Sequence, residues 1–244
     1  ANEYGGHVHL GLGLRKVAVL GSASFTRFGD LRMGSNGPKD YHRPWYAQTF
    51  NGLDSMVMNS EPDLQVGSGY DNINLMGKLA YKPVEQLELG FNYYFSTTSD
   101  VPRYDRLLEV RPNGLPRSAE CYYGPQEWRM ASFTAKHSAE RGPWSKARLT
   151  AAWQDYGESR NDRNFRNASK RTQTERVSGL WLNVDMEKEL SARTQVLYGA
   201  EYVSNAVESK GKRVNQTTGA ETIINSRYPD GSEWSTASVY AGAM

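Results

Sequence analysis

The feature that most constrains this chain is an alternation of apolar and polar or small residues that recurs in about nine segments. In residues 7–14, for example, Val8, Leu10, Leu12 and Leu14 alternate with His and Gly. A period of two is that of a β-strand, whose successive side chains point to opposite faces of a sheet. The sequence therefore predicts an all-β fold. The predicted strands lie at about 7–14, 17–26, 73–82, 87–96, 128–140, 146–157, 179–186, 195–202 and 234–244.

The connections between these segments alternate between short and long. The short ones cover about residues 15–16, 83–86, 141–145 and 187–192. The long ones cover about residues 29–71, 98–127, 158–174 and 204–233. Structureless loops longer than ~15 residues are uncommon in compact domains. We therefore expect the four long connections to gather at one end of the strands and to carry function.

A transmembrane β-barrel explains both patterns. Lipid offers no hydrogen-bond partners, so a sheet that crosses a bilayer must pair its backbone groups between strands. Such barrels have an apolar outer face, short periplasmic turns and long extracellular loops. The predicted strands match the ~9–11 residues that a tilted crossing needs. Aromatic residues near strand ends, such as Tyr81, Tyr93 and Phe95, suit an interfacial girdle. The alternative is a soluble β-sandwich, whose strands also alternate but whose loops need not alternate in length.

Composition excludes several other classes. The chain is 38% hydrophobic and 11% aromatic, which argues against disorder. The single cysteine, Cys121, excludes a disulfide scaffold. The mean hydropathy is -0.69 and no stretch approaches ~18 consecutive apolar residues, so a helical membrane protein is excluded. A net charge of +2 gives no overall attraction to nucleic acid.

The strand count suggests that the chain is part of something larger. Bacterial single-chain barrels have an even number of strands, and an open sheet would leave unpaired edges in lipid. Residues 1–244 begin without an initiator Met or a signal peptide, and the last segment is still patterned at Met244. We expect closure to come from residues outside this sequence. Barrels of ~22 strands are transporters with a plugged lumen.

The loop sequences add a resemblance to a known family. Residues 69–72 and 77–83 surround the third strand, and 99–107, 121–128, 158–163 and 226–232 lie in the long connections. In order and spacing these segments resemble the barrel domain of TonB-dependent outer-membrane receptors, of the haem- and siderophore-receptor type common in Bacteroidetes. The resemblance implies about nine strands of a 22-stranded barrel in the outer membrane of a Gram-negative bacterium.

The resemblance also implies partners and a mechanism. In that family an N-terminal plug fills the barrel, and a TonB box engages the TonB–ExbB–ExbD machinery, which drives uptake with the proton motive force. Residues 1–244 contain the barrel pattern but neither the plug nor the TonB box. We expect further contacts with an iron chelate, with lipopolysaccharide of the outer membrane and with a surface lipoprotein above the barrel.

Three histidines are candidate haem contacts. His7 and His9 share the polar face of the first strand, where lumen lining is the simpler interpretation. His42 lies in the first long connection, ahead of Glu61-Pro62-Asp63-Leu64. Haem receptors place a ligating His before a similar Asn-Pro-Asp-Leu motif. This chain has Glu61 in place of the Asn, so it resembles haem receptors only in part at this motif. The scattered Cys and His residues predict no metal site, and we expect no resident cofactor.

Two long connections are rich in arginine and tyrosine. Guanidinium groups bind carboxylates in bidentate fashion, which favours capture of an anionic ferric siderophore or a haem propionate. The aromatic rings would stack on a flat ligand or pack the loops together. Contact with lipopolysaccharide and a plain solvated loop remain alternatives, because acidic residues lie among the bases. The candidate ligand contacts are Arg103, Tyr104, Arg106, Tyr122, Tyr123, Arg160 and Arg163, and the same loops contain Arg117 and Arg171.

The sequence thus predicts an outer-membrane receptor for active uptake of a ferric siderophore or haem. The alternative is an outer-membrane adhesin or structural barrel that binds a partner through its long loops. No enzymatic motif is present: Gly-x-Ser-x-Gly is missing and no pair of carboxylates stands out. We therefore expect no catalytic activity.

Overall fold

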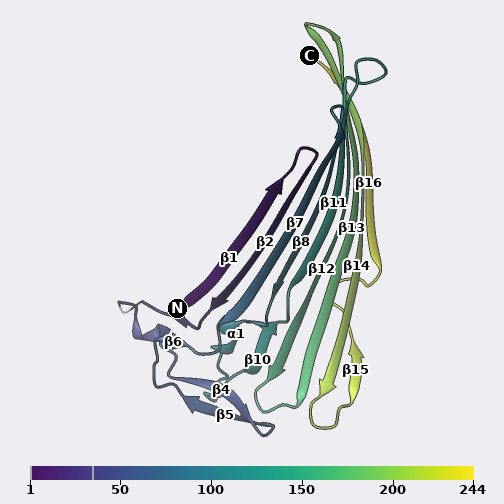
Figure 1. Ribbon diagram of the computed structural model, residues 1–244. Helices are drawn as coiled ribbons and strands as arrows, with labels where there is room; N and C mark the ends of the chain where they lie inside the picture. The colour runs from purple at the N-terminus through teal and green to yellow at the C-terminus, as the bar shows by residue number, and fades with distance from the viewer. Residues whose placement is uncertain (1, 35) are drawn as a thin grey trace.

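A computed structural model describes residues 2–34 and 36–244, most of which form one large curved antiparallel sheet, with two small two-stranded sheets in the first long connection (Figure 1). Each long strand pairs with the next one along the chain, which confirms the predicted strands, their order and the all-β fold class. The strands are β1 (Glu3–Gly13), β2 (Val17–Phe28), β7 (Tyr70–Val84), β8 (Leu87–Thr98), β11 (Glu127–Ser138), β12 (Lys146–Asn164), β13 (Ser169–Ser191), β14 (Thr194–Asn215) and β16 (Ser232–Ala243).

The register aligns an apolar row across all of these strands. Directly opposite residues share a face of the sheet. Leu12 is 62% exposed and Leu182 is 40% exposed, although both side chains are purely hydrocarbon. The row contains Leu12, Val19, Leu79, Phe91, Phe133, Ala151, Leu182, Tyr202 and Ala237. An uncovered band of this length is what a lipid-facing barrel wall requires, and a β-sandwich would have packed it against a second sheet.

The opposite face is polar or small, as predicted for a lumen. Its residues include Gly90, Thr134, Thr150, Asn183 and Glu201, which are successive cross-strand partners from β8 to β14. Among the described residues, buried apolar side chains are few: Ala152, Phe165 and Val203. The sheet therefore has one apolar and one polar face, and the described residues pack no central hydrophobic core.

The short turns are confirmed at one end of the strands. Residues 14–16, 85–86, 139–145 and 192–193 join successive strands there. At the other end the structure differs from the prediction. β12, β13 and β14 contain 19, 23 and 22 residues, well beyond the expected 9–13. Their pairing continues beyond the apolar band, where both faces are polar and the alternation is lost.

This extension changes two of the predicted loops. The expected loop 158–174 is mostly strand, and only residues 165–168 join β12 to β13. The expected loop 204–233 begins with the outer part of β14 and then returns along it as β15 (Glu221–Ile224). The strands therefore extend into these two connections further than the sequence predicts, because backbone pairing does not need an apolar face.

The other two long connections are folded as well. The first connection, residues 29–69, contains β3 (Leu31–Arg32), η1 (Lys39–Tyr41), β6 (Leu64–Gln65) and a hairpin of β4 (Trp45–Phe50) and β5 (Leu53–Met58). The hairpin turns at Asn51-Gly52, both with positive φ, as a two-residue hairpin turn requires. The second connection, residues 99–126, contains β9 (Val101–Pro102), α1 (Tyr104–Leu107) and β10 (Ser118–Tyr123). Within residues 2–34 and 36–244, no helix is long and apolar enough to cross a membrane.

Candidate functional site

Beyond the apolar band, β10, β12 and β13 form a three-stranded patch. β11 pairs with β12 along residues 146–157, and β10 pairs with β12 along residues 160–164. Cys121, Asp162 and Arg171 are successive partners across the patch, and so are Glu120, Arg163 and Lys170. Because neighbouring residues alternate between faces, these two rows lie on opposite sides. We call the side of Cys121 the front face and the side of Glu120 the back face.

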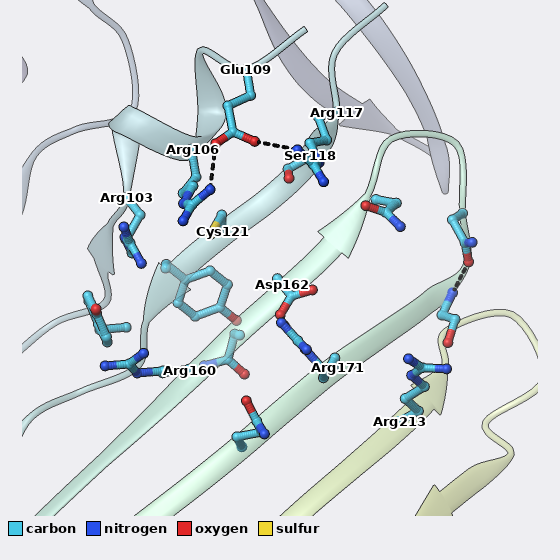
Figure 2. A pocket seen from close by; sticks show the side chains of 17 residues that line it. Arg103, Arg106, Glu109, Arg117, Ser118, Cys121, Arg160, Asp162, Arg171 and Arg213 are labelled. Carbon is cyan, nitrogen blue, oxygen red and sulfur yellow. Dashed lines mark hydrogen bonds and ion pairs between the residues drawn. The ribbon is translucent and has the colours of Figure 1, made fainter. Parts of the chain in front are cut away.

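The front face is one wall of a cavity of about 620 Å³. This volume falls within the range of ~300–1,000 Å³ that is usual for small-molecule sites. The second connection supplies the facing residues, and β14 adds Arg213 at the side (Figure 2). By strand parity, the front face continues the polar inner face of the sheet. The cavity therefore lies at the end of the polar face where the long connections gather.

The cavity has a surplus of positive charge. Its lining carboxylates are Glu109 and Asp162. Glu109 accepts from Arg106 at 2.6 Å and from Arg117 at 3.2 Å, while Arg171 lies 2.7 Å from Asp162. Within the described chain, Arg213 makes no ion pair. The lining arginines are Arg103, Arg106, Arg117, Arg160, Arg171 and Arg213. Asp105, outside the lining, also pairs with Arg103 at 2.7 Å, and the positive charge that remains suits a ligand that carries several anionic oxygens.

Tyr123 organises two of these arginines. The guanidinium carbon of Arg160 lies 5.0 Å from the centre of the Tyr123 ring, and that of Arg103 lies 5.6 Å from it. Both contacts are within the range of a cation–π interaction. The Nε atom of Arg160 is buried and makes no hydrogen bond to the described residues, and the carboxylate of Glu158 lies 4.0 Å from it. Burial raises the pKa of the nearby Cys121 thiol, which therefore adds no negative charge to the cavity.

The structure brings five of the predicted ligand contacts together at this cavity: Arg103, Arg106, Tyr122, Tyr123 and Arg160. Tyr104 belongs to α1 and is exposed outside the lining. Arg163 is buried on the back face, where it is 4% exposed.

The three histidines lie elsewhere. His7 and His9 are exposed on β1, with ring centres 5.7 Å apart. His42 lies in the first connection, with its Nε2 atom 3.2 Å from Asp63 Oδ1. None of the three lines the cavity. Among the described residues, no group of three or more His, Cys, Asp or Glu is arranged to hold a metal ion.

Sequence reasoning missed Arg213. This residue lies about forty positions beyond Arg171 in the chain, yet the two are direct partners in the β13–β14 register. The alternating pattern ends near Tyr202, so the sequence predicts a loop at Arg213 and no neighbouring strand for it. Extending the predicted pairing of these two strands outward would have found it.

The comparisons with known proteins support the fold. No protein-family model matches the chain, and no curated protein matches it. The structure of the ferric yersiniabactin uptake receptor FyuA from Yersinia pestis is similar, with a TM-score of 0.52 over 98% of this chain. The identity is 12%, and the chain spans 34% of the length of that receptor. The likeness shows that this chain has the fold of a piece of the wall of an outer-membrane β-barrel receptor.

Proposed function

We propose that this chain is part of the barrel of a TonB-dependent receptor that imports an anionic iron chelate across the outer membrane. The observation that carries the proposal is the cavity lined by six arginines, set beyond an uncovered apolar band. The band would lie in the bilayer, so the cavity would face the outside of the cell. The similar structure is named as an uptake receptor for a ferric chelate, which supports the same class of function.

The residues of the cavity favour a ferric siderophore over haem. A siderophore arrives with its iron already coordinated, so the protein needs only to bind the anionic groups at the periphery. Haem would gain from an axial ligand, but no histidine lines this cavity, and its two tyrosines, Tyr122 and Tyr123, are already in contact with Lys170 and with two arginines. His42 is instead held near Asp63 in the first connection. Arginine forks and the Tyr123 ring would together bind carboxylate, phenolate or catecholate groups.

The remaining parts of the proposal lie outside residues 1–244. The plug, the TonB box and the strands that close the barrel belong to the rest of the protein. Energy would come from TonB–ExbB–ExbD, acting through the plug. Lipopolysaccharide would contact the outer face just beyond the apolar band, where Arg129 and Arg176 point outward by strand parity.

An adhesin or structural barrel is the second candidate. The observation that favours it is the exposed apolar surface of the β4–β5 hairpin: Leu53 is 73% exposed and Met58 is 85% exposed. A protein partner, such as a surface lipoprotein, would cover these side chains. A receptor that imports its ligand with the help of such a lipoprotein would show the same feature.

Binding and uptake measurements on the full-length protein in outer membranes test the proposal. The probes are radiolabelled ferric siderophores with carboxylate or catecholate groups, and haem. We expect saturable binding of an anionic ferric chelate, and a loss of affinity of at least about tenfold on Arg213→Gln, because Arg213 lines the cavity and makes no ion pair within the described chain. Arg27→Gln is the matched control, because Arg27 is an exposed arginine on β2 outside the cavity. Adhesion to a partner protein without binding of any chelate would favour the second candidate.

A further inference from the structure

Arg163 occupies the centre of the back face, directly behind the cavity wall. Its side chain is 4% exposed, and that of Asp54, from β5 of the first connection, is 1% exposed. Nη1 of Arg163 donates to Asp54 Oδ2 at 2.8 Å, and Nη2 donates to Oδ1 at 2.8 Å. Two parallel bonds of this kind fix the angle as well as the distance between the two groups.

The other donors of Arg163 are also satisfied. Nε donates to Glu120 on β10 at 2.7 Å, Nη1 to the carbonyl of Asn167 at 3.0 Å, and Nη2 to Thr49 on β4 at 3.0 Å. A guanidinium group has five N–H donors, and five hydrogen bonds are formed. Arg163 therefore has no donor left for a ligand, which separates it from the arginines of the cavity.

The partners of Arg163 come from three different segments. Asp54 and Thr49 belong to the β4–β5 hairpin, Glu120 to the second connection, and Asn167 to the turn between β12 and β13. Asp54 also accepts from the backbone N–H of Arg166 at 2.6 Å. One buried side chain thus joins two long connections to the turn between β12 and β13.

The electrostatics favour the charged forms of these groups. Burial alone would raise the pKa of Asp54, but hydrogen bonds from Arg163, Thr49 and the backbone of Arg166 hold it below its ordinary value. Burial opposes the charge of Glu120 in the same way, and hydrogen bonds from Arg163 and Lys170 lower its pKa.

Three residues of the back face, Glu120, Arg163 and Lys170, are chain neighbours of residues that line the cavity. Glu120 precedes Cys121, Arg163 follows Asp162, and Lys170 precedes Arg171. Lys170 lies 3.0 Å from Glu120 and donates to Tyr122 OH at 2.6 Å, so it ties β13 to β10 across the back face. A shift of any back-face residue moves the backbone of a front-face neighbour. The β4–β5 hairpin lines no part of the cavity.

We propose that Arg163 is a positioning residue: with Asp54 it clamps the β4–β5 hairpin against the back of the β10–β12–β13 patch, and the clamp sets the geometry of the arginine cavity on the front. The identity of the ligand in this inference rests on the proposed function, whereas the clamp and its effect on the cavity do not. It predicts that ligand affinity depends on a hairpin that the ligand does not touch. It also reassigns Arg163 from ligand contact to support.

The experiment compares Arg163→Met, Arg163→Lys, Asp54→Asn and the double variant Asp54→Asn/Arg163→Met in the full-length protein in outer membranes. Three quantities are measured: cleavage of the β4–β5 hairpin by added protease, the rate at which a maleimide alkylates Cys121, and the affinity for the ferric chelates. The Cys121 rate reports on the cavity without any ligand, because Cys121 lines it. The control is Arg27→Met, which breaks an exposed Arg–Asp pair elsewhere.

We expect Asp54→Asn and Arg163→Met each to expose the hairpin to protease and to change the Cys121 alkylation rate at least about fivefold. Chelate affinity should fall at least about tenfold, and the double variant should be no worse than the more affected single variant. Arg163→Lys should rescue only part of each effect, because an ammonium group cannot make two parallel bonds. Arg27→Met should change nothing.

The outcomes distinguish the clamp, its effect on the cavity and the proposed function from one another. An exposed hairpin with an unchanged Cys121 rate and unchanged affinity would overturn the positioning role. A hairpin that stays protected in both single variants would overturn the clamp itself. If the unaltered protein binds no chelate while the clamp variants still change hairpin cleavage and the Cys121 rate, the proposed function fails and the clamp stands.

Discussion

Arg163 and Asp54 are 109 residues apart in the chain, and their side chains meet in a buried bidentate ion pair with both N–O distances at 2.8 Å. The pair joins the first long connection to the outer end of β12. It lies on the reverse side of the strands whose front side forms the arginine cavity. The first long connection, Glu120 of the second and the outer ends of β12 and β13 are therefore held together as one folded unit.

Removing one partner of this buried pair should reduce the stability of the folded connections far more than removing one partner of an exposed pair. Removing one partner of a buried pair leaves an uncompensated charge and typically costs about 3–5 kcal/mol. We expect Arg163→Met to abolish the protection of the β4–β5 amides in hydrogen exchange. Arg27→Met, at the exposed pair with Asp71, should leave amide exchange nearly unchanged, because solvent screens an exposed ion pair. Equal effects of the two variants on local exchange would contradict the burial argument.

The clamp should be insensitive to pH across the physiological range. The pKa values of Asp54 and Glu120 are lower in the folded protein than their ordinary values of 3.8 and 4.5. A lowered pKa contributes stability that is present above the unfolded pKa and is lost as pH falls through the folded pKa. We expect the hairpin to stay attached down to about pH 4 and to detach below it. Pepsin cleavage of the hairpin between about pH 2 and pH 5 measures this, and detachment near neutral pH would refute it.

Arg213 should contribute more to anion binding than Arg171 does. Both line the cavity and are direct cross-strand partners, but Arg171 is paired with Asp162 at 2.7 Å, whereas Arg213 makes no ion pair within the described chain. A guanidinium group without a carboxylate partner offers its full positive charge to an anionic ligand. We expect Arg213→Gln to weaken chelate binding about tenfold or more, which is about 1.4 kcal/mol, and Arg171→Gln to weaken it less. Titration of the chelate at low and high salt tests the order, and the reverse order would exclude this distribution of charge.

Glu175 should be replaceable by glutamine without loss of stability. Its carboxylate is buried, neither oxygen is hydrogen-bonded within the described residues, and it lies directly opposite Glu158. Burial raises the pKa of Glu175, an effect that Arg227 and Arg160 oppose and that Glu158 reinforces. A raised carboxyl pKa lowers stability as pH rises through the unfolded and then the folded pKa, and has no such effect below the unfolded value. Glu175→Gln should therefore stabilise the protein near pH 7 and leave it unchanged at low pH.

Glu158 is the matched control for this prediction. It accepts hydrogen bonds from Tyr156 OH at 2.9 Å and from Gln126 Nε2 at 3.2 Å. Glu158→Gln should weaken both bonds and destabilise the protein. Urea unfolding of both variants in micelles at two pH values gives the comparison. A destabilised Glu175→Gln variant at neutral pH would show that the carboxylate has a partner in the folded protein.

Two neighbouring residues on β13 test which face meets lipid. Leu182 belongs to the apolar row, and Asn183 points to the inner face. An arginine on the lipid face at the bilayer midplane costs about 2–4 kcal/mol, whereas a lumenal position tolerates charge. We expect Leu182→Arg to reduce assembly into the outer membrane strongly, and Asn183→Arg to leave it nearly unchanged. Equal tolerance of the two variants would mean that the apolar row does not face lipid.

The sequence by itself determined the membrane-crossing part of this protein. Within the bilayer the two faces of each strand meet lipid and water, so residues such as Leu79, Phe91 and Leu182 must alternate with polar or small ones, and this alternation is legible in the chain. The strand order followed from the short turns, because antiparallel neighbours are joined by tight hairpins. The arginines of the second connection were also visible as a basic cluster.

Only the tertiary structure decided what lies beyond the band. There both faces of a strand are polar, so the sequence carries no period to mark that β12–β14 continue, and Arg213 was assigned to a loop. Side-chain direction was equally hidden: Asp162 and Arg163 are adjacent and both charged, yet one lines the cavity and the other is buried behind it. Their roles depend on a contact with Asp54, and a partner that distant in the chain becomes a neighbour only when the connections have folded together.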